Sequence, residues 1–77
     1  MTLQLVTAND CHFCARARHV LDRLGIDAQE FDLDSPEADA LAATGIPLAF
    51  LPVLTDGTRV VAYGRFSEKR LRRELGL

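Results

Sequence analysis

NDCHFC, residues 9–14, places two thiols three residues apart where a strand-like run of sequence gives way to a helix-like one. Cys11 and Cys14 are the only 2 cysteines among the 77 residues. Counting placements, two cysteines scattered at random have this spacing only about one time in forty. The spacing therefore indicates that the two thiols act as a pair.

The sequence on either side of the pair predicts a strand and then a helix. Residues 2–7, TLQLVT, form a short β-branched and apolar run that is typical of a buried first strand. From Cys11 onward the apolar residues recur at steps of three or four. They are Phe13, Ala17, Val20, Leu21 and Leu24. This period predicts an amphipathic helix with both cysteines in its first turn, ended by Gly25 in a left-handed conformation.

The middle of the chain predicts a second strand over residues 28–33 and a short helix over residues 37–44. Ser35 and Pro36 mark the start of that helix, because serine caps free amides and proline suits the first helical position. Gly45 is expected to end it. Residues 46–51, IPLAFL, are apolar but interrupted, and we interpret them as a connection that packs down on the core.

The last part of the chain predicts a hairpin and a final helix. Pro52 opens a third strand over residues 53–55, and Asp56-Gly57 predicts a tight two-residue turn into a fourth strand over residues 58–62. Gly64 is expected to break that strand. Ser67 then caps a helix through Leu75, with Phe66 and Leu71 spaced as a hydrophobic staple.

The predicted order, β-α-β-α-β-β-α, is that of an α/β protein with a four-stranded mixed sheet and three helices. Residues 1–77 have room for one domain. Each of the first two helices is expected to join parallel strands by a right-handed crossover, and the hairpin adds an antiparallel edge.

Composition narrows the class of protein. With 48% hydrophobic and 26% charged residues, the chain is typical of a water-soluble globular domain and has no run that could span a bilayer. The net charge of -2 gives no basic field for nucleic acid, and Lys69, Arg70, Arg72 and Arg73 are interpreted as the wet face of a helix. The N-terminus lacks the pattern of a secretory signal. We expect a cytoplasmic protein, a monomer or weak dimer with no membrane partner.

A thiol pair in a reducing cytosol favours catalysis over a structural staple. Cys11 lies at a predicted helix N-terminus, where unpaired amides and the helix dipole lower a thiol pKa below about 8.5. Cys11 is thus the expected nucleophile, and Cys14, one turn further in, is expected to resolve the mixed disulfide. Two alternatives remain: both cysteines could be small buried hydrophobes, or half of a zinc site. Zinc needs further ligands, and His12 and His19 lie on the same helix and would not converge with the sulfurs.

The residues between the cysteines have two interpretations each. His12, when protonated, could add positive charge near Cys11 and shift its redox potential, or it could be an exposed residue without a role. Phe13 is interpreted as partly core and partly a surface against which a partner rests.

Together, the Cys-x-x-Cys helix, the order of elements and Pro52 before the third strand resemble the thioredoxin fold in its short glutaredoxin version. Residues 14–18, CARAR, are similar to the Cys-x-Arg-Ala-Lys run of dithiol glutaredoxins. The resemblance covers nearly the whole chain. It implies a cis peptide bond between Leu51 and Pro52, with these two residues shaping a substrate groove that faces Cys11. Pro47 is the rival position for that proline.

The chain departs from the family at two places. Glutathione-binding glutaredoxins usually carry a Gly-Gly-x-Asp-Asp type motif before the last helix, whereas residues 64–68 read GRFSE, so that Arg65 replaces a glycine. This segment also resembles the Ser-Gly-Phe-Arg-Pro segment of small redoxins that reduce ribonucleotide reductase and draw electrons from thioredoxin reductase. The family's Pro-Tyr dipeptide is replaced by His12-Phe13. The substrate-binding residues implied are His12, Phe13, Leu51, Pro52, Arg65, Phe66 and Ser67.

The resemblance implies a thiol-disulfide oxidoreductase that reduces protein or small-molecule disulfides through Cys11 and Cys14. Such exchange requires no metal or organic cofactor, although glutathione could serve as the reductant. Because of Arg65, we expect thioredoxin reductase with NADPH to be the faster electron donor. The alternatives are an iron-sulfur cluster or metal carrier, held by Cys11 of two chains and glutathione, and a non-catalytic binding module.

Overall fold

The computed structural model describes residues 3–77, so Thr2 of the predicted first strand lies outside the described residues. Its elements follow the predicted order and confirm the thioredoxin-like fold of the glutaredoxin type. They are β1 (Leu3–Thr7), α1 (His12–Arg23), β2 (Ala28–Asp32), α2 (Pro36–Ala43), β3 (Val53–Thr55), β4 (Val60–Tyr63) and α3 (Glu68–Leu75). Among these helices, none is both long and apolar enough to cross a bilayer.

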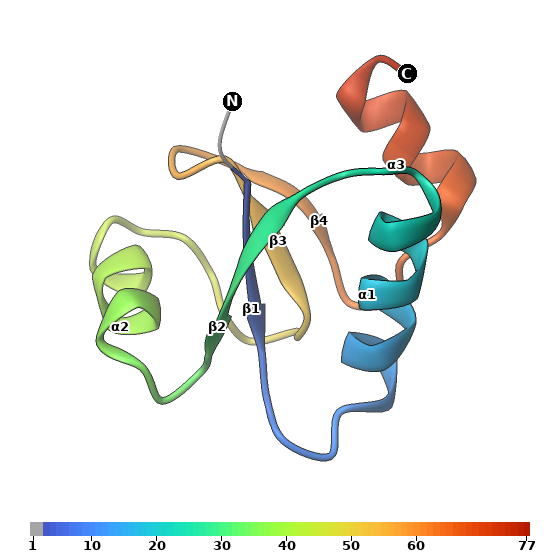
Figure 1. Ribbon diagram of the computed structural model, residues 1–77. Coiled ribbons are helices and arrows are strands. Elements are labelled where there is room, and N and C mark those ends of the chain that lie inside the picture. The colour runs from blue at the N-terminus through green and yellow to red at the C-terminus, as the bar shows by residue number, and fades with distance from the viewer. Residues whose placement is uncertain (1–2) are drawn as a thin grey trace.

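The four strands form one mixed sheet in the order β2-β1-β3-β4. β1 pairs in parallel with β2 and antiparallel with β3, and β3 pairs antiparallel with β4. Helices α1 and α3 lie together on one side of the sheet and α2 lies on the other (Figure 1). The sheet and the helices on its two sides therefore form three layers.

Alternation along β1 divides the core between the two faces. Leu3 and Leu5 pack with the buried residues of α1 and α3, whereas Val6 packs with those of α2. Successive strand residues point to opposite faces, so one strand supplies both clusters. Both ends of the staple, Phe66 and Leu71, are buried in the first cluster, 2% and 1% exposed, which confirms their predicted role.

The helix boundaries agree with the capping signals. Ser35 and Ser67 each occupy an N-cap, and each side-chain oxygen accepts the backbone N–H three residues on. Gly25 has a φ of 68° just beyond α1, and the N–H of Ile26 donates to the carbonyl of Leu21 at 2.9 Å. This is the Schellman pattern, which satisfies carbonyls that the end of the helix leaves free.

The predicted crossover through α2 is wrong. β3 runs antiparallel to β1, and therefore also to β2, so α2 does not join parallel strands. After α2 the segment of residues 44–52, which contains Gly45, Pro47 and Pro52 and forms no helix, runs back along the sheet (Figure 1). β3 consequently starts at the end of the sheet where β1 and β2 finish. The start of β3 thus shares that end with the cysteines.

The predicted two-residue hairpin turn is also wrong, because residues 56–59 connect β3 and β4. A two-residue type I′ turn needs positive φ at both central positions, and of Asp56 and Gly57 only Gly57 has it, at 98°. The Asp56 carboxylate instead accepts the N–H groups of Thr58 and Arg59 at 2.9 and 3.0 Å and the Thr58 hydroxyl at 2.8 Å. These bonds lower the pKa of Asp56 to about 2.

Candidate active site

Four chain segments meet at one end of the sheet. β1 ends there, α1 begins there, β3 begins there and β4 ends there, because β3 pairs antiparallel with both neighbours. The register sets Val53 opposite Val6 on one side and Tyr63 on the other, and the Gly64 N–H donates to the Pro52 carbonyl at 2.9 Å. The topology therefore places residues distant in sequence around the start of α1.

Cys11 is the N-cap of α1. It has an extended backbone, with φ -92° and ψ 108°, and its Sγ accepts the backbone N–H of Cys14 at 3.2 Å. Asp10 before it has a φ of 58°, a left-handed conformation that aspartate tolerates better than most residues, and its carboxylate faces water. This turn connects β1 to α1 and places the Cys11 sulfur next to the free backbone N–H groups of the first helical turn.

The two cysteines form a disulfide, with their Cα atoms 5.2 Å apart. Their environments differ: the Cys14 side chain is 0% exposed in the core, whereas Cys11 is partly exposed. A substrate can therefore reach the sulfur of Cys11 and not that of Cys14. This difference agrees with the roles predicted for the two thiols, which stay predictions.

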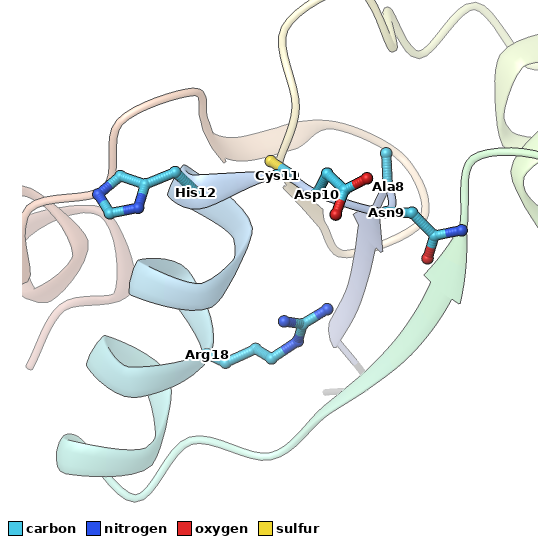
Figure 2. Close-up of a pocket in the computed structure, with 6 residues that line it drawn as sticks. All are labelled: Ala8, Asn9, Asp10, Cys11, His12 and Arg18. Carbon is cyan, nitrogen blue, oxygen red and sulfur yellow. The ribbon is translucent and has the colours of Figure 1, made fainter.

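On one side of Cys11 lies a depression of about 470 Å³, which we term the polar depression. It is lined by Ala8, Asn9, Asp10, Cys11, His12 and Arg18. Figure 2 shows the ring of His12 pointing away from the Cys11 sulfur and the side chain of Arg18 extending from the middle of α1. His12 thus belongs to the rim of the site.

Arg18 forms an ion pair with Glu30 on β2. Its guanidinium donates to both carboxylate oxygens of Glu30, at 2.7 and 2.8 Å, and the Thr7 hydroxyl donates to Glu30 at 3.3 Å. The paired hydrogen bonds raise the pKa of Arg18 and lower that of Glu30. Arg18 remains exposed, and its partner lies on another element, so no local pattern of sequence indicates the pair.

A larger depression of about 550 Å³, which we term the aromatic depression, is lined in part by Phe13, which lies between the two cysteines in sequence. Its lining consists of Phe13, Ala49, Phe50, Leu51, Tyr63, Gly64, Arg65 and Arg70. It brings together three of the residues that the sequence analysis implicated, Phe13, Leu51 and Arg65. Phe13 is 43% exposed and lies outside both core clusters, so its side chain belongs to this surface rather than to the core.

Three large side chains of the aromatic depression were missed by the sequence analysis. Residues 46–51 were expected to pack down as a whole, and Ile46 does so, but Phe50 is 69% exposed. The ring of Tyr63 lies beside that of Phe50 at a tilt of 39°, with the centroids 6.3 Å apart, and the Arg70 guanidinium lies 6.0 Å from the Tyr63 ring centroid. These residues come from three separate segments, and no local pattern of sequence joins them.

The remaining predicted binding residues lie elsewhere. Phe66 is 2% exposed in the core, and its backbone carbonyl accepts the Arg16 Nε–H at 3.3 Å, which ties the segment before α3 to α1. The Ser67 hydroxyl accepts the Arg70 N–H in its capping role. The Leu51–Pro52 bond is cis, as predicted, and Pro52 is buried at the start of β3. The bond before Pro47 is not cis, which removes the rival placement.

Within residues 3–77, no three or more histidine, cysteine or acidic side chains are grouped so that they could hold a metal ion. His12 and His19 do not join the cysteines. A disulfide whose exposed sulfur accepts a helix amide can exchange with thiols and other disulfides.

Comparison with known proteins places this geometry in a family. A family model described as glutaredoxin matches residues 3–44, which is more than half of the chain and includes both cysteines. Comparison with curated proteins and with solved structures gave no match. The matched range ends before the aromatic residues Phe50 and Tyr63 and before Arg65.

Proposed function

The chain belongs to the glutaredoxin family, and on this premise we propose that it is a thiol-disulfide oxidoreductase acting through Cys11 and Cys14. The observation that carries the proposal is the hydrogen bond from the Cys14 amide to the Sγ of Cys11 at the start of α1. An N–H donor and the positive end of the helix both favour a thiolate over a thiol. The nucleophilic form is therefore stabilised at the sulfur that substrates can reach.

The exchange proceeds in two steps. The thiolate of reduced Cys11 attacks one sulfur of a substrate disulfide, forms a mixed disulfide and expels the other sulfur as a thiolate, which takes up a proton. The thiol of Cys14 then loses its proton and attacks the Sγ of Cys11, which releases the second substrate thiol and closes the Cys11–Cys14 disulfide. The substrate disulfide gains two electrons, and the protein dithiol loses them.

Disulfide-containing proteins are the proposed substrates, and thioredoxin reductase with NADPH is the proposed electron donor. Arg65 supports this choice, because it occupies the position at which glutathione-binding relatives have a glycine that lets the ligand approach the backbone. A guanidinium can nevertheless pair with a carboxylate of glutathione, so the ranking of the two donors is the quantity to measure.

The test compares the two donors side by side. The oxidised protein is supplied with thioredoxin reductase and NADPH in one assay, and with glutathione, glutathione reductase and NADPH in the other, using the same low-molecular-weight disulfide. NADPH consumption is expected in both and to be faster with thioredoxin reductase. Faster turnover with glutathione would reject the donor and leave the dithiol mechanism in place, whereas no turnover with either donor would reject the proposed activity.

A further inference from the structure

A second hollow continues the aromatic depression away from the disulfide. It has a volume of about 280 Å³, and we term it the apolar groove; its lining consists of Pro47, Ala49, Phe50, Val60 and Tyr63. It shares Ala49, Phe50 and Tyr63 with the aromatic depression. The two hollows therefore form one track that runs from beside Phe13, over the Phe50–Tyr63 ring pair, and along β4.

The ridge between the two hollows is aromatic and faces solvent. Phe50 is 69% exposed and Tyr63 is 52% exposed. Large side chains in a continuous apolar patch are costly to leave in water, and such patches mark binding surfaces. Within residues 3–77, no other part of the structure covers either ring enough to bury it. The ridge is therefore suited to an apolar side chain supplied from outside the chain.

The aromatic depression, which is the end of the track that Phe13 of the Cys-x-x-Cys segment lines, carries positive charge. Arg65 and Arg70 line the aromatic depression, and among the described residues that line either hollow none is acidic. Glu68 lies between them in sequence, but its carboxylate is 3.7 Å from the Nη2 of Arg23. This local excess of positive charge contrasts with the net charge of -2 of the whole chain. An anionic group is the complementary occupant.

We propose that this track selects an extended polypeptide with acidic residues next to its disulfide-bonded cysteine and an apolar residue further along the chain. The inference rests on the proposed function, because it names the substrate class for the same exchange at Cys11. The acidic side chains pair with Arg65 and Arg70, and the apolar side chain lies in the groove beyond Tyr63. A small disulfide occupies only the end near Cys11 and leaves the apolar groove uncovered.

The test uses synthetic peptides as probes. Each peptide has one cysteine joined in a mixed disulfide to thionitrobenzoate, with two residues on either side of the cysteine varied and a leucine beyond them. The pre-reduced protein converts each probe to peptide thiol and thionitrobenzoate while its own dithiol becomes the disulfide. The release of thionitrobenzoate is followed by absorbance in single-turnover mixing, so no electron donor enters the measurement.

The wild-type protein is expected to reduce a probe with glutamates beside the cysteine faster than probes with glutamines or lysines. The preference is expected to weaken with added salt, because exposed charges are screened. Replacing the leucine of the glutamate probe with serine should slow its reaction with the protein. Glutathione joined to thionitrobenzoate should react more slowly than the glutamate–leucine probe.

Variants assign these preferences to the track. Arg70→Gln should slow the reaction of the glutamate probe by up to about fivefold and leave the rate with the glutamine probe unchanged, since one exposed charge pair contributes about 0.2–1 kcal/mol. Phe50→Ala should slow the leucine probes about three- to tenfold and the serine probes much less. Arg73→Gln is the matched control, an exposed arginine on the same helix outside both hollows, and should change neither rate.

The outcomes separate the inference from the function on which it rests. Three results would each overturn the inference while leaving disulfide exchange established. They are equal rates for all peptides, an equal loss of rate in Arg70→Gln and Arg73→Gln, and a fastest reaction with the glutathione probe. No reaction with any probe, nor with an uncharged disulfide such as bis(2-hydroxyethyl) disulfide, would instead reject the exchange activity itself.

Discussion

The start of α1 and the start of α3 have the same backbone design with a different atom at its centre. Both N-caps are extended, and in both the side chain accepts the N–H three residues on: Cys11 Sγ from Cys14 at 3.2 Å, and Ser67 Oγ from Arg70 at 3.0 Å. The hydroxyl of Ser67 satisfies a free amide and thereby stabilises the helix. The sulfur of Cys11 occupies the same place, where the free amide favours its charged form. One capping geometry thus serves stability at α3 and reactivity at α1.

The largest effect is expected when the N-cap residue of α1, Cys11, is replaced by serine, the N-cap residue of α3. Cys11→Ser retains a good N-cap residue, so its unfolding free energy should lie within about 0.5 kcal/mol of that of the reduced wild-type protein. Its disulfide-reducing activity should be lost completely, because the nucleophile is gone. Urea unfolding and NADPH-coupled turnover measure the two effects separately. Residual turnover in Cys11→Ser would mean that Cys14 can attack substrates itself.

The two thiols of the reduced protein should differ in reactivity by about tenfold or more, because only Cys11 is both exposed and placed at the helix start. Iodoacetamide at a pH below neutrality should label Cys11 first, as peptide mass spectrometry can show. A matched control places a single cysteine at the other cap, as Ser67→Cys in a Cys11→Ser/Cys14→Ser background. That thiol should also react below neutrality if the cap geometry is the cause, and equal labelling of Cys11 and Cys14 contradicts the assignment.

Ser67→Ala removes the capping oxygen of α3 and should destabilise the protein by about 1 kcal/mol, since it leaves the Arg70 amide without its side-chain acceptor. Thermal unfolding of the reduced protein provides the measurement. Ser35→Ala, at the equivalent position of α2, is the internal comparison and should cost a similar amount. A change smaller than about 0.3 kcal/mol at both positions would show that capping adds little here, and the parallel with Cys11 would lose its energetic basis.

The Asp56 carboxylate in the hairpin also accepts backbone N–H groups, and its charge depends on pH. The pKa of Asp56 falls from its usual 3.8 to about 2, so its ionised form contributes stability that is fully present above about pH 4 and is lost as the pH falls toward 2. Asp56→Asn keeps an acceptor oxygen but does not titrate. The stability difference between wild type and Asp56→Asn should therefore shrink from pH 5 to pH 2 in urea unfolding. A constant difference would place the acid sensitivity elsewhere.

The sequence predicted those parts of the molecule whose causes are local. Caps at Ser35 and Ser67, the stop at Gly25 and the period of α1 each depend on residues within one turn of one another, and the structure has them where they were expected. The direction of β3 depends on how distant segments pack, whereas the longer hairpin turn follows from hydrogen bonds of the Asp56 carboxylate to Thr58 and Arg59, which the Asp-Gly signal does not specify. Local signals at Pro52 and at Asp56-Gly57 were correct about position and incomplete about geometry.

The candidate site divides in the same way. Cys11 and Cys14 were evident from their spacing, because a helix brings residues three apart onto neighbouring positions. Phe50, Tyr63 and Arg70 were missed, since the apolar or basic character of each had an ordinary explanation within its own segment. They come together with Phe13 through the pairing of β3 with β1 and β4 and through the packing of α3, where Arg70 lies 6.0 Å from the Tyr63 ring centroid. Knowledge of that pairing and packing would have been the one signal able to find them.

The antiparallel pairing of β1 with β3 has a consequence for how the protein can change. The reactive pair lies in the first half of the chain, within the range that the family model matches, and the track beside it is built mainly from residues 47–70. The two parts meet through the β1–β3 strand pair, and residues of both also pack together in the two core clusters. The cysteine pair and the exposed side chains of the track thus come mainly from different parts of the chain. Replacing exposed track residues such as Phe50 or Arg70 should therefore alter the proposed choice of partner without disturbing the cysteine turn or the shared core.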